Sequence, residues 1–332
     1  ELFTLFHFPG SVSPKIEART IHTSRLQKRA LAAKDYRRLL PFFPEAIRRF
    51  DLSGFDTVVS SSHCVAKGVE ARGKPHLCYC HTPMRYIWDR FDDYFPRTKL
   101  LQRAAATAML PYLRRWDVST SSEVTRFVAN SSFVRERIGK YYRRDAEIIH
   151  PFVDRQFLDA PIAHERDDYH LVVSALVPYK KVDLAVDAIA ATGRKLVVIG
   201  GGPLLDKLRS RAPANVSFLG HVPRETVIAH LARARSLILP GIEDFGITPL
   251  EAMALGTPVV ALAEGGVLDS VVDNVTGNFF REPAVQSLGH ALDAVERREW
   301  DRETIRRHAA QFSRSRFEEQ FLGALQRTTG SR

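Results

Sequence analysis

The sequence predicts an α/β protein of two doubly wound, Rossmann-like domains, each a parallel sheet with helices on both faces, with a cleft between them. Its 332 residues exceed the length of one average domain. Short apolar runs alternate with helical patterns of about 10 to 15 residues, which is typical of βαβ units. Strands covered on both faces read as continuous apolar runs, as these do. We expect one domain over residues 1–150 and a second over residues 151–332.

The second half gives the clearer pattern. Its apolar runs predict strands over 169–176, 195–200, 215–220, 236–240 and 257–262. Helical patterns lie between them, at 181–192, after Pro203, near 224–234 and near 247–255. A last helix over 314–327, which we assign to the second domain, repeats Phe317, Phe321 and Leu325 at helical spacing. Ligands of such sheets bind beyond the carboxyl ends of the strands.

The first half carries similar strand candidates, over 2–7, 56–62, 76–81 and 126–132. Basic helical stretches lie between them. We take 147–154 as the linker between the domains, because Pro151 fixes its own φ and restrains the residue before it. The chain opens at Glu1 directly into a predicted strand, without an earlier βα unit.

The excess positive charge lies in the first half. Residues 1–150 carry 26 Lys and Arg against 15 Asp and Glu, which leaves 22 against 23 for the remainder. Such an imbalance favours an anionic partner. A nucleic-acid-recognition motif is missing, so we expect no nucleic-acid partner. The basic and apolar stretch 25–50 fits an anionic membrane surface or the lipid diphosphate of an acceptor. It also fits a pair of ordinary amphipathic helices with the apolar face inward, and both interpretations can hold at once.

The apolar runs and the cysteines indicate where the protein is located and whether it binds a metal ion. The longest runs, such as 196–200 and 258–263, are much shorter than the ~20 residues that span a bilayer. Three cysteines offer no disulfide framework, which favours a reducing compartment, the cytoplasm. Cys64, Cys78, Cys80 and His81 could in principle hold zinc. However, Cys78 and Cys80 alternate within an apolar strand and CxxC spacing is missing, so we interpret the cysteines as buried and inert.

The stretch 243–261 is the most informative. Phe245, Gly246 and Ile247 follow a strand and open a helix, so their backbone N–H groups can bind an anion. Glu243 stands before that helix and Glu251 about two turns inside it. A sugar nucleotide, with a diphosphate flanked by hydroxyls, matches this layout. The spacing of the two glutamates alone also fits ordinary solvated surface carboxylates.

Several motifs, in order along the chain, resemble the family-four, group 1 GT-B glycosyltransferases. They are CYCHTPMRYIWD (78–89), VANSSFVRERI (128–138), LVPYKKVDLAV (176–186), VIGGGP (198–203), EDFGITPLEA (243–252), GTPVVA (256–261) and GGVLDSVVDNVTGNFF (265–280). The motifs CYCHTPMRYIWD and LVPYKKVDLAV are similar to those of the mannosyltransferase-like branch of bacterial enzymes that build surface polysaccharides. The resemblance covers most of the chain and implies a GT-B fold.

The resemblance implies catalytic roles for Glu243, Lys180 and His81. Glu243 would accept hydrogen bonds from hydroxyls of the donor sugar, and Lys180 would pair with the departing diphosphate. His81 would face the sugar across the cleft. Glu251 would bind the ribose hydroxyls. The remaining donor-binding positions implied are the backbone at Phe245, Gly246 and Ile247, the nucleobase side at Gly201, Gly202, His221 and Val222, and Lys181.

The sequence departs from the family pattern at two places. Ala175 stands where the family usually has an arginine, so one cationic diphosphate contact is missing and Lys181 substitutes for it in part. The family's opening strand and glycine-rich loop are also missing, from which we expect an N-terminally truncated chain. An Asp-x-Asp triplet is not found, so we expect neither a metal ion nor a cofactor beyond the nucleotide sugar itself.

The implied function is that of a retaining hexosyltransferase. The donor would be a nucleotide sugar, GDP-mannose first and a UDP-sugar otherwise, bound by the second domain. The acceptor would be a saccharide on a membrane lipid diphosphate, bound by the basic first domain at the inner face of the plasma membrane. The alternative is a catalytically impaired nucleotide-sugar-binding protein, which the alanine at position 175 and the missing N-terminal segment favour.

Overall fold

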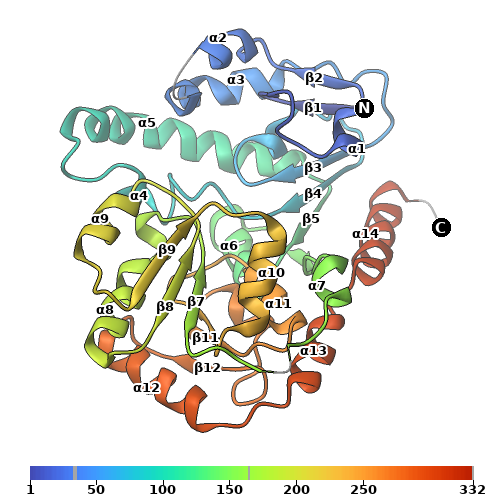
Figure 1. Ribbon diagram of the computed structural model, residues 1–332. Helices are drawn as coiled ribbons and strands as arrows, with labels where there is room; N and C mark the ends of the chain where they lie inside the picture. Colours follow the sequence, from blue (N-terminus) through green and yellow to red (C-terminus); the bar gives the residue numbers. More distant parts are fainter. Residues whose placement is uncertain (33–35, 164, 331–332) are drawn as a thin grey trace. The chain divides into compact units, whose positions relative to one another are not determined.

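The computed structural model describes residues 1–32, 36–163 and 165–330 (Figure 1). Residue contacts divide the chain into two compact units. Unit 1 consists of Glu1–Asn130, Val134–Ile148 and Leu322–Arg332, and unit 2 of Ser131–Phe133 and Ile149–Phe321. Both units have parallel sheets and helices, so the predicted α/β class is confirmed.

Unit 1 contains a four-stranded parallel sheet of order β3-β4-β5-β6 and a separate parallel pair, β1 with β2. The strands are β1 (Leu2–Thr4), β2 (Ile21–Thr23), β3 (Val58–Ser62), β4 (His76–Cys80), β5 (Arg126–Ala129) and β6 (Ala146–Ile148). The helices are α1 (Pro14–Glu17), α2 (Gln27–Ala32), η1 (Tyr36–Phe42), α3 (Phe43–Arg48), η2 (Ala66–Gly68), α4 (Phe91–Tyr94), α5 (Leu100–Ser119), η3 (Thr120–Glu123) and α6 (Ser132–Tyr142). The predicted strand 126–132 ends early, because residues 132 onward form α6.

Unit 2 contains a six-stranded parallel sheet of order β12-β11-β10-β7-β8-β9. Its strands are β7 (His170–Val173), β8 (Leu196–Ile199), β9 (Val216–Gly220), β10 (Leu237–Leu239), β11 (Val259–Leu262) and β12 (Gly277–Phe280). The helices are α7 (Arg155–Asp159), η4 (Pro178–Lys180), α8 (Val182–Thr192), α9 (Leu205–Arg211), α10 (Arg224–Arg233), α11 (Ile247–Ala254), η5 (Gly266–Asp269), α12 (Val285–Arg297), α13 (Arg302–Ala310) and α14 (Arg314–Thr329). The strands β2 and β12 were not predicted, and β6 overlaps the stretch 147–154 that we took as the linker.

The sheet of unit 2 is buried on both faces. Successive residues of a strand point to opposite faces, and in β10 Leu237 and Leu239 belong to one apolar core while Ile238 belongs to the other. Residues 259–262 of β11 alternate between the same two cores. Helices therefore cover both sides of this sheet, which is why its strands are continuous apolar runs in the sequence.

The C-terminal helix differs from the expectation that it belongs to the second domain. Residues Arg314–Phe321 of α14 belong to unit 2, but the part from Leu322 onward belongs to unit 1. There Ala324 and Thr328 are buried, and Arg327 forms an ion pair with Glu147 at 2.6 Å. The spacing of Phe317, Phe321 and Leu325 predicts a helix but cannot tell which unit its residues contact.

The stretch 25–50 forms α2, η1 and α3, apart from residues 33–35, which lie outside the described residues. Phe43 and Ile47 are buried in the core of unit 1, and Leu26 and Leu40 pack against it. These apolar side chains therefore face inward, as the amphipathic-helix interpretation of this stretch expects. Among the helices that the structure describes, none is both long and apolar enough to cross a membrane.

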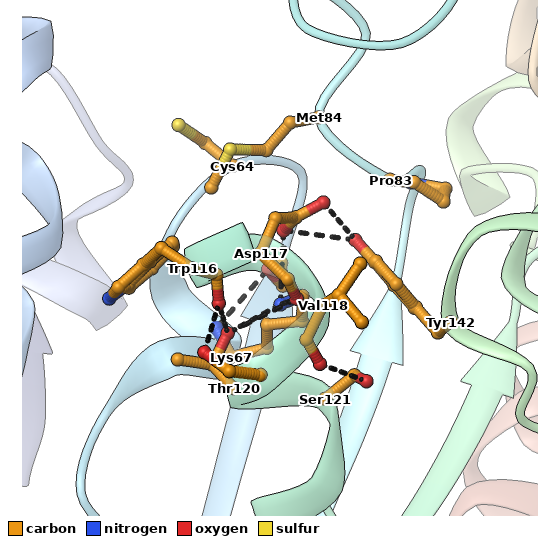
Figure 2. A network of polar contacts seen from close by, with 12 residues as sticks. Cys64, Lys67, Pro83, Met84, Trp116, Asp117, Val118, Thr120, Ser121 and Tyr142 are labelled. Carbon is orange, nitrogen blue, oxygen red and sulfur yellow. Dashed lines mark hydrogen bonds and ion pairs between the residues drawn. The ribbon is translucent and has the colours of Figure 1, made fainter. Parts of the chain in front are cut away.

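A buried ion pair joins the helices η2 and α5 of unit 1, and its further contacts reach η3 and α6 (Figure 2). Lys67 of η2 is 1% exposed and its Nζ lies 3.0 Å from the carboxylate of Asp117, which is fully buried in α5. Lys67 Nζ also donates to Thr120 Oγ1 at 2.7 Å and lies 4.7 Å from the centre of the Tyr142 ring. Tyr142 Oη and Trp88 Nε1 donate to Asp117 Oδ2 at 3.0 and 2.8 Å. Hydrogen bonds thus compensate the desolvation of both charges.

Lys67→Met should lower the free energy of unfolding by about 3 to 5 kcal/mol, because it leaves the Asp117 carboxylate buried without its cation. Arg155→Met is the matched control, since Arg155 and Asp159 form an ion pair with side chains 88% and 61% exposed. It should cost less than about 1 kcal/mol. Denaturant unfolding measures both values. Equal losses in the two variants would show that the buried pair is not a main contribution to stability.

Candidate functional site

The site expected from the sequence lies at the carboxyl edge of the six-stranded sheet. From β7 the chain continues to β8 and β9 on one side, and it returns to place β10 on the other side of β7. The loops after β7 and β10 therefore leave the sheet in opposite directions, and the crevice between such loops is the usual ligand site of a doubly wound sheet. Residues 174–181 follow β7 and residues 240–246 follow β10.

Lys180 and Glu243 form an ion pair across this switch point. Their side chains are 19% and 13% exposed, so the pair is partly shielded from water. The two loops approach closely because Gly241 has no side chain. A Cβ at Gly241 would lie 2.6 Å from the carbonyl oxygen of Tyr179 and 2.8 Å from Cα of Lys180. The sequence indicated both charged residues but not their direct contact.

Helix α11 begins beside this ion pair. Gly246 is its N-cap residue, with φ +87°, a backbone conformation that L side chains rarely adopt. A glycine N-cap brings no side chain to the first turn, so the amides there stay available to an anion that benefits from the helix dipole. Ile247, the first residue of the helix, is 47% exposed. Helix α11 thus begins where the sequence predicted a helix start, and anion binding there stays a prediction.

Phe245 lies in this loop and has a buried side chain. Its side chain is 3% exposed and stacks on the His150 ring with centroids 5.5 Å apart. The Phe312 ring lies 6.1 Å away. Phe245 can therefore offer only its backbone to a ligand, while its ring anchors the loop in the core of unit 2.

Two glycines of the loop after β11, Gly265 and Gly266, contact the backbone of residues 243–245. Gly266 N donates to Glu243 O at 2.8 Å, and a Cβ on Gly266 would lie 2.0 Å from Asp244 O and 2.5 Å from Phe245 Cα. Gly265, at φ +91°, forms an isolated parallel bridge with Glu243. Only glycine fits at these contacts, so the position of the loop depends on both residues.

Sequence reasoning missed three residues near the site, of which Ser131 contacts the loop 243–246 and Ser132 contacts Asp269 of η5. Ser131 Oγ donates to Asp244 O, and Ser132 donates through both N and Oγ to the carboxylate of Asp269, with the N–H bond at 2.6 Å. These contacts place Ser131–Phe133 within unit 2, although the residues on either side belong to unit 1. The serines and Asp269 lie inside motifs that the sequence analysis quoted, but partners more than 100 residues apart leave no local signal.

The glycine-rich loop after β8 lies against the loop after β7. A Cβ on Gly202 would lie 2.6 Å from Leu176 O, and one on Gly201 would lie 2.6 Å from Nε2 of His221. The structure thus brings Gly201 and Gly202 together with exposed His221, which follows β9. Val222 is half-buried and packs against the core of unit 2.

Glu251 lies inside α11 and is half-buried. Burial raises the pKa of its carboxyl group; Arg224 lowers this pKa and Asp154 raises it further. Arg224 and Asp154 themselves form an ion pair at 2.6 Å. The spacing of the two glutamates also fitted ordinary solvated surface carboxylates, but Glu251 is half-buried and is not one of these.

The remaining predicted residues lie as follows. His81 directly follows β4 in unit 1, and its Nε2 lies 2.8 Å from Ser61 Oγ. Lys181 is exposed and adopts a left-handed conformation, φ 53°, at the start of α8. Ala175 is exposed just after β7 and offers no cation there.

The cysteines do not form a metal site. Cys78 and Cys80 are buried in β4, as expected, and Cys64 is half-buried with Sγ 3.1 Å from Tyr86 Oη. Burial raises the pKa of the Cys64 thiol to about 11. Within residues 1–32, 36–163 and 165–330, no group of three or more His, Cys, Asp or Glu side chains is placed to hold a metal ion.

Glu251→Gln should raise the free energy of unfolding at pH 7, and the gain should shrink as the pH falls to about 4. The pKa of Glu251 is raised above 4.5 in the folded state. The folded protein is therefore more stable when Glu251 is protonated, and it loses this stability as the pH rises and the carboxyl group ionises. Chemical denaturation at both pH values tests this. Glu225→Gln, at an exposed glutamate of α10, should change stability by less than about 0.5 kcal/mol at either pH.

Two family models match the chain. Residues 4–157 match "Glycosyltransferase Family 4" and residues 154–312 match "Glycosyl transferases group 1". The first match covers most of the N-terminal half, and the second covers the loops after β7, β8, β9, β10 and β11 described above.

Curated relatives include mycobacterial enzymes. A GDP-mannose-dependent alpha-(1-6)-phosphatidylinositol monomannoside mannosyltransferase of Mycolicibacterium smegmatis is 33% identical over 219 residues, which are 56% of this chain and 56% of the relative. A D-inositol 3-phosphate glycosyltransferase of Mycobacterium sp. is 29% identical over 221 residues, 58% of this chain and 49% of the relative. The chain spans about half the length of the curated relatives it matches.

Solved structures share the fold. Sucrose-phosphate synthase from Thermosynechococcus elongatus superposes with a TM-score of 0.72 at 17% identity, over 99% of this chain and 89% of that one. Anabaena HepE, solved in complex with UDP, gives 0.65 at 16% identity, over 92% and 85%. These similarities establish the GT-B fold that the sequence predicted. The chain thus has a GT-B fold, and its two halves match the models of family 4 and group 1 glycosyltransferases.

Proposed function

We propose that this protein is a retaining hexosyltransferase that moves a hexose from a nucleotide sugar onto a saccharide carried by a lipid diphosphate, in surface polysaccharide synthesis. The first choice of donor is GDP-mannose, because the mannosyltransferase of M. smegmatis that uses it is among the relatives. A UDP-sugar is the other candidate, since HepE binds UDP and UDP-glucose. The proposed location is the cytoplasmic face of the plasma membrane.

The observation that supports this proposal is the Lys180–Glu243 ion pair beside the start of α11. A cation, a carboxylate and a row of helix amides meet at the switch point of the sheet. A sugar diphosphate needs these three kinds of group: a cation and N–H donors for the phosphates, and an acceptor for sugar hydroxyls. The ion pair also holds both side chains in place before a ligand arrives.

In the proposed reaction, the bond from the sugar C1 to the diphosphate oxygen breaks and negative charge grows on that oxygen. Lys180 and the amides at Gly246 and Ile247 stabilise this charge, an effect that is greatest in the transition state. Glu243 orients the sugar through its hydroxyls. The acceptor hydroxyl attacks C1 from the same face and passes its proton to the departing diphosphate. No metal ion takes part in this scheme.

The other predicted positions complete the proposal. Glu251 accepts hydrogen bonds from the ribose, and Gly201, Gly202, His221 and Val222 border the nucleobase. Lys181 adds a second cation near the diphosphate, and His81 of unit 1 acts on the sugar. These roles rest on the resemblance of the motifs and on their place at the ends of strands.

A second candidate is a nucleotide-sugar-binding protein with impaired catalysis, because Ala175 stands where related enzymes are expected to have an arginine. A guanidinium forms a bidentate contact with phosphate that a neighbouring lysine does not reproduce. Calorimetry with GDP, UDP and their sugars, together with a transfer assay, separates the two. Binding without transfer or donor hydrolysis favours the second candidate.

Lys180→Met and Glu243→Gln should each reduce kcat/KM for transfer by about a hundredfold or more, since each removes an interaction worth about 3 kcal/mol in the transition state. Lys207→Met and Glu225→Gln alter exposed residues of α9 and α10 and serve as matched controls. A transfer assay with a panel of nucleotide sugars gives the rates. Wild-type turnover in either site variant would refute its assigned role, provided the wild-type protein is active.

Gly266→Ala should weaken the binding of GDP or UDP by about tenfold or more, because its Cβ would collide with the backbone of Asp244 and Phe245. Gly289→Ala is the control in the same unit. Its Cβ would meet only Thr192 Cγ2, at 3.9 Å, and an alanine there favours α12. Titration calorimetry compares the two affinities. If both variants bind as the wild type does, the loop at residues 243–246 is not the diphosphate site.

A further inference from the structure

One face of α5 is apolar and exposed to solvent. Leu100 and Leu101 are 74% and 89% exposed, and Tyr112 is 49% exposed. Ala104, Ala105, Ala108 and Pro111 are exposed on the same side of the helix. We call these seven residues the α5 outer face. The opposite side of the helix holds Leu113 and Trp116 in the core of unit 1, so α5 has a second apolar face that does not contribute to this core.

The charges around this face are positive. The 20 residues of α5 contain one carboxylate, Asp117, and it is buried in the pair with Lys67. Lys99 and Arg97 are exposed just before the helix, and Arg115 is exposed one turn from Tyr112. The two acidic residues of α4, which precedes α5, are engaged, since Asp92 pairs with Arg103 at 2.6 Å and Asp93 with Arg90 at 3.5 Å.

We propose that the α5 outer face docks onto an anionic lipid bilayer, with Leu100 and Leu101 inserted at the level of the headgroups. Exposed apolar side chains flanked by Lys and Arg are the composition of helices that lie in a membrane interface. The cations then contact anionic headgroups. Soluble proteins rarely leave such a contiguous apolar patch without a partner.

The charges favour a bilayer over a second copy of this chain. In a two-fold symmetric dimer the same patch lies on both sides, so Arg97, Lys99 and Arg115 would face the cations of the partner. The α5 outer face has no carboxylate to compensate them. A surface of anionic headgroups provides that compensation.

This surface differs from the one that the sequence suggested. Residues 25–50 combine basic and apolar side chains, but Phe43 and Ile47 of that stretch are buried. The inference rests on the proposed location at the plasma membrane, but it can fail separately from the transfer reaction, because binding to vesicles needs neither donor nor acceptor.

The test is sedimentation of the full chain with phosphatidylcholine vesicles, with and without phosphatidylglycerol. We expect binding only with the anionic lipid, and weaker binding as salt rises. Leu100→Ser with Leu101→Ser should reduce binding at least tenfold. Leu219→Ser with Leu322→Ser is the matched control, since these leucines are 40% and 57% exposed elsewhere, and it should bind as the wild type does.

A third variant separates charge from insertion. Arg97→Gln with Lys99→Gln should weaken binding and reduce its dependence on salt. The proposal is overturned if the wild type does not bind the anionic vesicles, or if the two leucine double variants bind equally. It is also overturned if the wild type dimerises through this face without binding vesicles, which sedimentation velocity on the same proteins detects.

Discussion

The close approach of the loops at the carboxyl edge of the six-stranded sheet is the constraint on which the candidate site depends. Gly241 lets residues 240–246 touch the backbone of Lys180, and Gly266 lets the next loop touch Asp244 and Phe245. Without these contacts, Lys180 and Glu243 would not meet. The glycines thus act through geometry, and the chemistry resides in the charged side chains and amides that they bring together.

Much of the fold could be predicted from the sequence because unit 2 has a simple pattern. Its buried parallel strands are continuous apolar runs, and five of the six were identified. The sixth, β12, begins with Gly277, where a Cβ would lie 2.0 Å from Val259 O. The two apolar residues at its end, Phe279 and Phe280, make too short a run to indicate a strand. The strand β2 was missed because its sequence, Ile-His-Thr, contains one apolar residue and so gives no apolar run.

The site could be predicted only where its signal is local. A helix start marked by Gly246, with glutamates at fixed distances, can be found in one segment of the chain. The bonds from Ser131 to Asp244 and from Ser132 to Asp269 join segments more than 100 residues apart. The same limit applies to α14, whose apolar spacing predicts a helix but not its division between the units. It applies also to the stretch 25–50, where composition cannot distinguish a buried apolar face from an exposed one.

In the proposed function, the Lys180–Glu243 pair would have to both bind and release an anion. The pair is neutral as a whole, so an incoming diphosphate does not meet a full uncompensated cation, and the amides of α11 provide much of the initial attraction. In the proposed reaction, Lys180 would interact with the charge that develops on the leaving oxygen, and Glu243 would accept hydrogen bonds from neutral sugar hydroxyls instead. Ala175 offers no cation at the same edge. In the proposed reaction, Lys180 would therefore have to exchange Glu243 for the diphosphate as its partner. It could not do so if it stayed paired with Glu243.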